Sequence, residues 1–241
     1  MGLQNVLSRN YGCVKNREDF QFRLLSSIND DQQVMDILMW FLQQARVHPF
    51  MRIPEDKARK VARWYSDQFA YNNLSVGAFH KKTGKLAAIG IQEKRRFGDQ
   101  RGLVDCPEDF SGKESLQKSL EEDYYESKRG ENGFYMDCLI GAVYPQYASI
   151  GLASEAACMA VAIATEVGCV DIVTFVSHAY AMHMYKKMGY RIAASRKVQE
   201  FVDPQSGKRP FVEFDKKHES YFFATKSLNF RKGDAIKNLS K

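Results

Sequence analysis

The chain has 241 residues, of which 44% are hydrophobic, and its formal net charge at pH 7 is +6. This length and apolar content can bury a substantial core and favour one domain with a long insertion over two small domains. The positive charge favours anionic ligands such as a phosphorylated cofactor, and by itself it would also suit nucleic acid or acidic membranes. We find neither a nucleic-acid motif nor an apolar stretch of membrane-spanning length, so we expect no nucleic acid, no membrane, and a soluble cytoplasmic protein.

The five cysteines are odd in number and lack CxxC spacing. Both features argue against a disulfide framework and against a zinc site, so we expect no metal. Cys138, Cys158 and Cys169 lie in apolar runs and are interpreted as core thiols.

In chain order, the first elements follow a polar, aperiodic segment at residues 1–18, which we expect to be a flexible leader. Residues 18–25 alternate apolar and polar side chains, which is the pattern of a half-buried strand. Apolar residues then recur at helical spacing over 29–46 and, after a short loop, over 54–71. The first third of the chain therefore predicts a strand and two helices.

Two β-rich runs, 74–79 and 86–93, flank a short turn that contains glycine and predict a hairpin. The chain then becomes rich in charge and glycine. Residues 98–132 are too many for an ordinary connector, so we interpret them as an insertion that is either a binding lid or a mobile excursion. Within it, residues 115–125 favour one exposed helix.

The rest of the chain predicts a strand at 134–143, a helix from 150 to 168, a buried strand at 170–177, a short helix at 180–187, and strands at 190–194 and 221–228. The complete order is β, α, α, β, β, β, α, β, α, β, β, which is typical of one α+β domain with a mixed sheet. We assign residues 19–230 to this domain and residues 231–241 to a polar tail.

The stretch 134–168 joins an apolar strand, a turn at 144–146 and a helix that opens near Gly151. Small residues crowd the start of this helix, so another molecule can approach its unpaired backbone N–H groups at the positive end of the helix dipole. These features indicate an anion site suited to a pyrophosphate. The alternative is that the small residues only allow the helix and the sheet to pack.

Residues 144–153 and 178–190 together resemble the two central motifs of the GCN5-related N-acetyltransferase (GNAT) superfamily. In that superfamily the first motif, Gln/Arg-x-x-Gly-x-Gly/Ala, cradles the pyrophosphate of acetyl-CoA. Gly151 and Ala153 match it, whereas Ala148 replaces the leading Gln or Arg. Backbone N–H groups make most of the hydrogen bonds to the pyrophosphate, so the missing side chain predicts weaker cofactor binding rather than none. The alternative is that the chain is a catalytically inactive member of the superfamily.

The second motif of the superfamily often reads Asn-x-x-Ala-x-x-Leu-Tyr-x-x-x-Gly-Phe. The residues in register with it here are His178, Ala181, Met184, Tyr185, Gly189 and Tyr190. The resemblance makes Tyr185 the candidate general acid, which would protonate the departing thiolate, and the alternative is a packing tyrosine. His178, in place of Asn, either lines the cofactor groove or is a polar residue at a strand end.

The resemblance also implies the fold: α+β, with a mixed, mostly antiparallel sheet splayed between the fourth and fifth strands and flanked by helices on both faces. Acetyl-CoA, the co-substrate, would lie between these strands, with backbone amides at 139–141 facing its thioester carbonyl. Gly141 is consistent with a bulge there. The expected cofactor-binding residues are Leu139, Ile140, Gly141, Val143, Ser149, Ile150, Gly151, Leu152, Ala153, Ser154, His178 and Tyr185.

The layout is most similar to the arylalkylamine (dopamine-type) N-acetyltransferases of animals, many of which carry a Glu-Pro pair between the first two helices. Here the pair is His48-Pro49, so His48 is either the candidate catalytic base or an exposed loop histidine. We interpret His183 as structural. Asp137 is interpreted first as a solvent-facing strand carboxylate, and binding of the substrate amine is the alternative.

Phe41, Phe50, Tyr124 and Tyr125 are candidates for an apolar cup around an arylalkyl group, and ordinary packing is the alternative. The predicted function is direct transfer of an acetyl group from acetyl-CoA to a small, arylalkylamine-like primary amine. The alternatives are a peptide or protein N-acetyltransferase and a catalytically degenerate CoA-binding module. No feature indicates an oligomeric state.

Overall fold

The computed structural model describes residues 2–43, 55–99, 111–128, 130–211 and 220–228. Its centre is a seven-stranded sheet with the strand order β1-β2-β3-β4-β5-β7-β6. Strands β4 and β5 run parallel, and the other neighbouring pairs are antiparallel. The strands are β1 (Phe20–Leu24), β2 (Val76–His80), β3 (Leu86–Arg96), β4 (Phe134–Val143), β5 (Cys169–Val176), β6 (Arg191–Lys197) and β7 (Ser220–Ser227).

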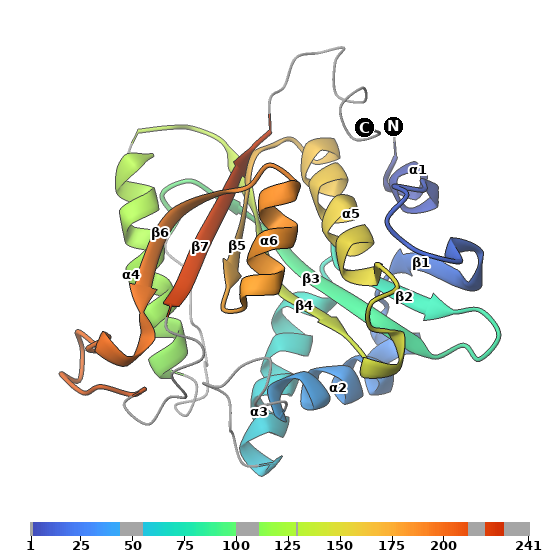
Figure 1. The fold of residues 1–241 in the computed structure, drawn as a ribbon, viewed down its shortest axis with the longest axis horizontal. Helices are drawn as coiled ribbons and strands as arrows, with labels where there is room; N and C mark the ends of the chain where they lie inside the picture. Colours follow the sequence, from blue (N-terminus) through green and yellow to red (C-terminus); the bar gives the residue numbers. More distant parts are fainter. Residues whose placement is uncertain (1, 44–54, 100–110, 129, 212–219, 229–241) are drawn as a thin grey trace.

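Helices cover both faces of this sheet (Figure 1). The helices are α1 (Leu3–Ser8), α2 (Ser27–Gln43), α3 (Glu55–Tyr65), α4 (Ser111–Ser127), α5 (Leu152–Glu166) and α6 (Ala179–Lys187). Met136 of β4 packs in the hydrophobic cluster of α1, α5 and α6, whereas the adjacent Tyr135 packs with α4. Successive strand residues point to opposite faces, so α4 and α5 lie on opposite sides of the sheet. The predicted α+β fold with helices on both faces is confirmed.

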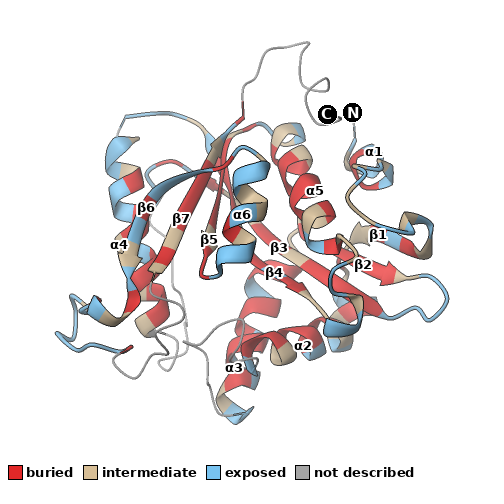
Figure 2. Ribbon diagram, in the orientation of Figure 1, coloured by how far each residue is buried: buried red, intermediate tan, exposed pale blue. Residues whose placement is uncertain are grey.

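The spacing of apolar residues in each helix and strand matches the faces that are buried in the fold (Figure 2). Strand β5 lies between β4 and β7 and is covered on both faces, which explains its nearly continuous apolar sequence. Helix α3 buries Ala58, Val61, Ala62 and Tyr65, which recur at helical spacing and form one side of the core with α2. A five-residue π-helical segment, Ser66–Ala70, continues α3 towards β2.

The sheet splits between its two parallel strands. Pairing of β4 with β5 runs from Phe134 opposite Cys169 to Cys138 opposite Thr174 and goes no further. Beyond that point β4 stays paired with β3, and β5 stays paired with β7. The predicted splay between the fourth and fifth strands is therefore confirmed.

A bulge in β4 coincides with the split. Ile91 of β3 lies opposite Ile140 while Gln92 lies opposite Cys138, so Leu139 is the extra residue of β4. The prediction of a bulge at Gly141 is wrong, because Gly141 is regularly paired with Gly90. A Cβ at Gly141 would meet no atom of the described residues within 4 Å, so among these residues the glycine leaves open space beside the strand.

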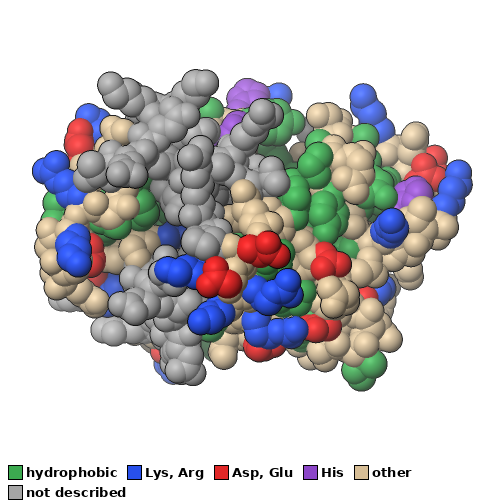
Figure 3. Space-filling model, turned by 90° about the horizontal axis from the view of Figure 1, so that it is seen from below, with side chains coloured by type: hydrophobic (Ala, Val, Ile, Leu, Met, Phe, Trp, Pro, Cys, Tyr) green, Lys and Arg blue, Asp and Glu red, His purple; other side chains and the backbone are tan. Residues whose placement is uncertain are grey.

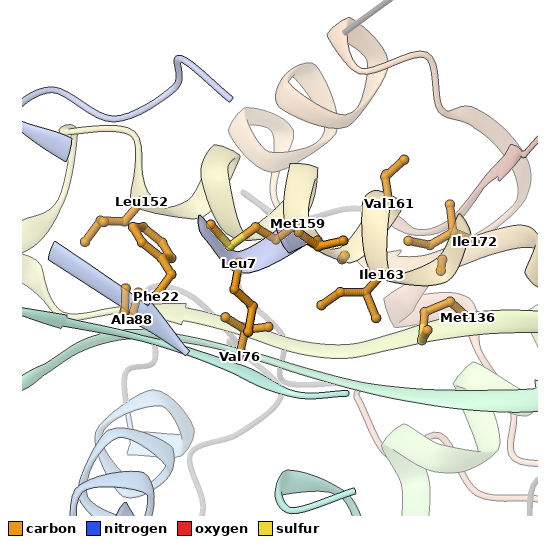
Figure 4. Close-up of a cluster of buried hydrophobic side chains, with 14 of the residues drawn as sticks. Leu7, Phe22, Val76, Ala88, Met136, Leu152, Met159, Val161, Ile163 and Ile172 are labelled. Carbon is orange, nitrogen blue, oxygen red and sulfur yellow. The ribbon is translucent and has the colours of Figure 1, made fainter. Parts of the chain in front are cut away.

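The N-terminal segment packs against α5, although its sequence favours a flexible leader. Val6 and Leu7 are buried in the core cluster beneath α5. Figure 4 shows Leu7 between Met159 of α5 and Val76 of β2. The polar residues that follow α1 bind the start of α5, as described below.

Helix α4 is longer than the predicted helix at 115–125, and the prediction that it is exposed is wrong on one side. Leu116, Leu120 and Tyr124 are buried against the sheet with Phe223. The insertion thus supplies a helix that covers the second half of the sheet. Its charged residues mask this role in the sequence, because only about every third or fourth residue faces the core.

Basic and acidic side chains are interspersed on the face shown in Figure 3. Arg63 of α3 forms ion pairs with Asp31 at 3.0 Å and with Asp67 at 3.5 Å. Among the described side chains visible in Figure 3, the positive charge is therefore not gathered into a basic surface. Among the described helices, none has the length and apolarity needed to cross a membrane.

Candidate functional site

A cavity of about 180 Å³ lies where β4 and β5 separate. On one side of the sheet it is lined by α5 and α6, and on the other by residues of α2, α4 and β7. The cavity therefore passes through the gap between the two strands. We call the part lined by α5, α6 and the diverging strand ends the α5 half, and the part lined by Phe41, Lys113, Phe175 and Tyr221 the α4 half.

A stripe of alanines forms one wall of the α5 half. Ala153, Ala156, Ala157 and Ala160 recur at i, i+3, i+4 and i+7 and line the cavity together. The short side chains keep the helix surface close to its backbone and leave room beside the strands. The sequence showed these small residues, but their spacing alone did not distinguish a cavity wall from helix packing.

The opposite wall is the free edge of β4. Leu139, Ile140, Gly141 and Val143 line the cavity beyond the point where pairing with β5 ends. Leu139 also has no partner in β3, because it is the bulge residue. Backbone groups at this edge can therefore serve a bound molecule rather than a neighbouring strand.

The loop before α5 has the backbone geometry of an anion-binding turn. Ser149 and Gly151 are both left-handed, with φ values of 63° and 96°. Residues of alternating hand turn successive N–H groups towards one point, and the first turn of α5 adds its own unpaired N–H groups. The side chain of Leu152 is buried in the core, so its predicted cofactor role would fall to its backbone. Ser149, Ile150, Gly151 and Ser154, which were also predicted to bind the cofactor, are not among the residues that line the cavity.

Tyr185 reaches the split from α6. It lines the cavity together with Thr174, whose side chain acts to lower the pKa of the phenol. Thr174 in turn donates to the carbonyl of Cys138 at 3.3 Å, across the last paired position of β4 and β5. Burial raises the pKa of Tyr185 to about 12, with a further contribution from Cys138. The phenol is therefore protonated at neutral pH and can act as a proton donor.

Tyr190 stands beside Tyr185 with its ring edge-on, at a centroid distance of 5.0 Å. It lines the cavity, is buried, and its hydroxyl has no hydrogen-bond partner among the described residues. Burial raises its pKa well above the usual value for tyrosine. Neither Tyr190 nor Thr174 was identified as a site residue from the sequence, since no pattern showed that both reach the split.

His178 is the N-cap of α6 and lines the cavity from an exposed position. Its Nδ1 accepts the backbone N–H of Tyr180 at 3.1 Å, so the neutral ring carries its proton on Nε2. The nitrogen that could accept a proton is thus engaged in the cap. His178 lies in the predicted region, where it orients the start of α6.

The α4 half contains a buried polar network. Lys113 donates to the Tyr65 hydroxyl at 3.2 Å, and that hydroxyl donates to Glu114 at 3.3 Å. Lys113 and Glu114 are also 3.8 Å apart as an ion pair. Tyr221 accepts a hydrogen bond from Gln117 at 2.9 Å. These side chains were not predicted, because they come together only when α4 packs on the sheet.

Several predicted residues lie elsewhere. Of the proposed aromatic cup, Phe41 lines the cavity, whereas Tyr124 and Tyr125 pack between α4 and the sheet. Asp137 is fully buried, 3.5 Å from Arg95, so its interpretation as a solvent-facing carboxylate is wrong. The reason is that α4 covers this face of β4. His183 is exposed on α6, away from the cavity lining.

His48 and Phe50 lie outside the described residues. Within the described ranges, no group of three or more His, Cys, Asp or Glu side chains is arranged to hold a metal ion.

Comparison with known proteins gives a match in fold. No protein-family model matches the chain, and no curated protein matches its sequence. The mosquito protein named arylalkylamine N-acetyltransferase like 5b is 16% identical to this chain. It superposes with a TM-score of 0.71 over 87% of this chain and 100% of its own. The Drosophila melanogaster polyamine N-acetyltransferase that forms N-acetylagmatine is 14% identical, with a TM-score of 0.71 over 87% of this chain and 100% of its own.

A more distant likeness is to the NatC complex bound to Gag peptide and CoA, which is 12% identical, with a TM-score of 0.54 over 88% of this chain and 99% of that one. These likenesses cover nearly the whole domain. The chain has the fold of the GNAT acetyltransferases.

Proposed function

We propose that the protein is an acetyl-CoA-dependent N-acetyltransferase that transfers the acetyl group directly to a small primary amine of the arylalkylamine type. The observation that carries this proposal is the cavity that crosses the sheet through the split between β4 and β5. Such a passage lets a thioester enter from the α5 half and an amine from the α4 half, so that the two reactants meet at the split. The fold shared with arylalkylamine and polyamine N-acetyltransferases supports the same reaction class.

The residues of the α5 half fit a CoA thioester. The left-handed Ser149 and Gly151 and the first turn of α5 offer N–H groups to a pyrophosphate. The alanine stripe and Gly141 leave room for a slender chain along the edge of β4. Ala148 gives this loop no cationic or amide side chain, so affinity would rest on the backbone.

Two groups at the split fit the chemistry of acyl transfer. Backbone N–H groups at the free edge of β4, beyond the last residue paired with β5, are suited to polarise the thioester carbonyl and to stabilise the negative charge that develops on its oxygen. Tyr185, with a pKa of about 12, is suited to protonate the thiolate as the C–S bond breaks. No covalent enzyme intermediate is required, because the amine attacks the thioester directly.

His48 is the proposed base that accepts the proton of the amine. With an ordinary pKa of about 6.5, a histidine becomes competent as the pH rises through that value. The rate should therefore rise between roughly pH 5.5 and 7.5, and His48→Ala should remove this limb of the pH profile. An unchanged limb in the variant would assign the proton transfer to another group.

The deciding experiment measures thiol release from acetyl-CoA with tyramine, dopamine, serotonin, polyamines and peptide amines as acceptors. Turnover with small amines supports the proposal. Turnover with peptides alone would favour a peptide N-acetyltransferase, the alternative that the likeness to a peptide-bound complex supports. Tight CoA binding without turnover of any acceptor would identify a degenerate CoA-binding module.

A further inference from the structure

Two cysteines that are far apart in sequence meet beside α5. Cys13, in the segment between α1 and β1, has its Sγ atom 3.8 Å from the Sγ of Cys158. Cys158 is buried in α5, whereas Cys13 is half-buried. The sulfur atoms are in van der Waals contact, and a disulfide bond of about 2.05 Å would require them to approach by only about 1.8 Å.

The position of Cys13 is fixed by a buried carboxylate. Glu155, in the first turn of α5, accepts the backbone N–H groups of Tyr11 and Cys13, both at 3.2 Å. It also pairs with Arg17 at 3.1 Å, and Glu155 itself is fully buried. Residues 11–17, which we call the strap, are thereby held along α5, so the two sulfur atoms face each other as a property of the fold.

The strap also touches the proposed anion loop. The backbone N–H of Lys15 donates to the carbonyl of Ile150 at 2.9 Å. The carbonyl oxygen of Cys13 lies only 1.8 Å from the point that a Cβ at Gly151 would occupy. Any covalent fixation of Cys13 therefore acts directly beside Gly151.

The two thiols are chemically unequal. The hydrogen bond from Cys158 lowers the pKa of Cys13, although burial and the Glu155 carboxylate oppose this effect. The same hydrogen bond, together with burial, raises the pKa of Cys158. Burial also raises the pKa values of Cys138 and Cys169. Since the thiolate is the reactive form, Cys13 is the thiol in the described part of the chain best suited to attack an oxidant.

We propose that Cys13 and Cys158 form an oxidisable dithiol, with hydroperoxides as the oxidant, whose disulfide bonds the strap to α5. The Cys13 thiolate attacks one oxygen of hydrogen peroxide; the O–O bond breaks, and the departing hydroxide takes a proton to become water. The sulfur of Cys158 then attacks the resulting sulfenic acid. The S–O bond breaks, and hydroxide leaves as water with the thiol proton of Cys158. Two thiols and one peroxide thus yield one disulfide and two waters.

The test is to treat the reduced full-length protein with hydrogen peroxide, block the remaining thiols with N-ethylmaleimide, and identify cross-linked peptides by mass spectrometry. We expect a peptide pair joined through Cys13 and Cys158 that dithiothreitol separates. Trypsin cleavage after Lys15 and Arg17 should slow at least fivefold in the oxidised protein, and its Tm should rise by several degrees.

The variants separate the two roles. In Cys158→Ser the sulfenic acid on Cys13 should persist and be trapped by dimedone, whereas Cys13→Ser should give neither product. Cys169 is a buried cysteine on β5, so Cys169→Ala is the matched control. This variant should still form the cross-link between Cys13 and Cys158.

Two results would overturn the proposal. One is equal trapping of the Cys13 sulfenic acid in wild type and in Cys158→Ser, which would show that Cys158 does not resolve it. The other is unchanged trypsin cleavage of the strap after the disulfide has formed. Neither result depends on acetyltransferase activity.

Discussion

The α5 half and the α4 half of the cavity are built in different ways. The α5 half comes mainly from one stretch of the chain, 134–190, in which strand, loop and helix follow one another. The α4 half brings together Phe41, Lys113, Phe175 and Tyr221 from four separate elements. The first half offers backbone groups and small side chains, and the second offers aromatic rings and a buried lysine.

The α5 half would therefore recognise a bound molecule mainly through backbone groups, and the α4 half mainly through side chains. Backbone N–H groups at a strand edge and a helix start tolerate many substitutions, because every residue but proline has one. Side chains gathered from distant elements depend on the packing of each element. On the proposed function, the α5 half would set the reaction and the α4 half would set the choice of amine.

The largest effect should come from removing the acid at the split. We expect Tyr185→Phe to lower kcat by about 10²–10⁴-fold, because the thiolate then leaves without a positioned proton donor. The CoA dissociation constant should stay within about twofold, since the ring is retained. Steady-state kinetics and calorimetry measure the two quantities. A kcat close to that of wild type would show that Tyr185 only packs against Tyr190.

The next largest effect should come from the loop before α5. Gly151→Ala places a Cβ on the Cys13 carbonyl and forces a left-handed φ on alanine. We expect a loss of about 2–4 kcal/mol in the free energy of unfolding and at least tenfold weaker CoA binding. Gly168→Ala is the matched control, because the φ of Gly168 is +78° but an added Cβ would meet no atom within 4 Å in the described part of the chain. It should cost only about 1 kcal/mol, as measured by urea unfolding. Equal losses in the two variants would contradict a special role for the contact with the strap.

A smaller effect should appear in the α4 half. The ammonium of Lys113 repels a protonated amine, so Lys113→Met should lower KM for the amine by about fivefold, equivalent to about 1 kcal/mol, and leave CoA affinity unchanged. Lys113→Arg keeps the charge and should leave KM within about twofold. If Lys113→Met instead raised KM, the acceptor would carry a group that needs the positive charge. Initial rates across an amine series decide between these outcomes.

The same contrast explains what could be predicted from the sequence. The α5 half was predictable because its signals are local: the apolar strand, the glycine before α5 and the register of Tyr185 with Gly189 lie within a few dozen residues. The bulge was assigned to Gly141 rather than Leu139 because strand register depends on the partner strand, which the local sequence does not specify.

Prediction failed where long-range packing decides. Helix α4 reads as charged and exposed, yet it buries Leu116 and Leu120, covers Asp137 and delivers Lys113 to the cavity. The sequence of the strap predicts a polar leader. Most of the hydrogen bonds that the strap makes to Glu155 come from backbone N–H groups, which nearly every residue type has, so the sequence does not reveal them.

The smallest effect should come from Tyr190, which follows α6 and lines the cavity beside Tyr185. Its buried hydroxyl has no partner among the described residues, so the folded protein has lost the hydration of this group without a replacement. Tyr190→Phe should therefore raise the free energy of unfolding by about 1 kcal/mol and Tm by about 2–4 °C in the absence of ligand. If bound acetyl-CoA uses the hydroxyl, the gain in Tm should shrink or reverse at saturating acetyl-CoA, which differential scanning fluorimetry can follow. A lower Tm without ligand would mean that the hydroxyl already has a partner, and Tyr190 would then belong to the packing of α6 rather than to the cavity.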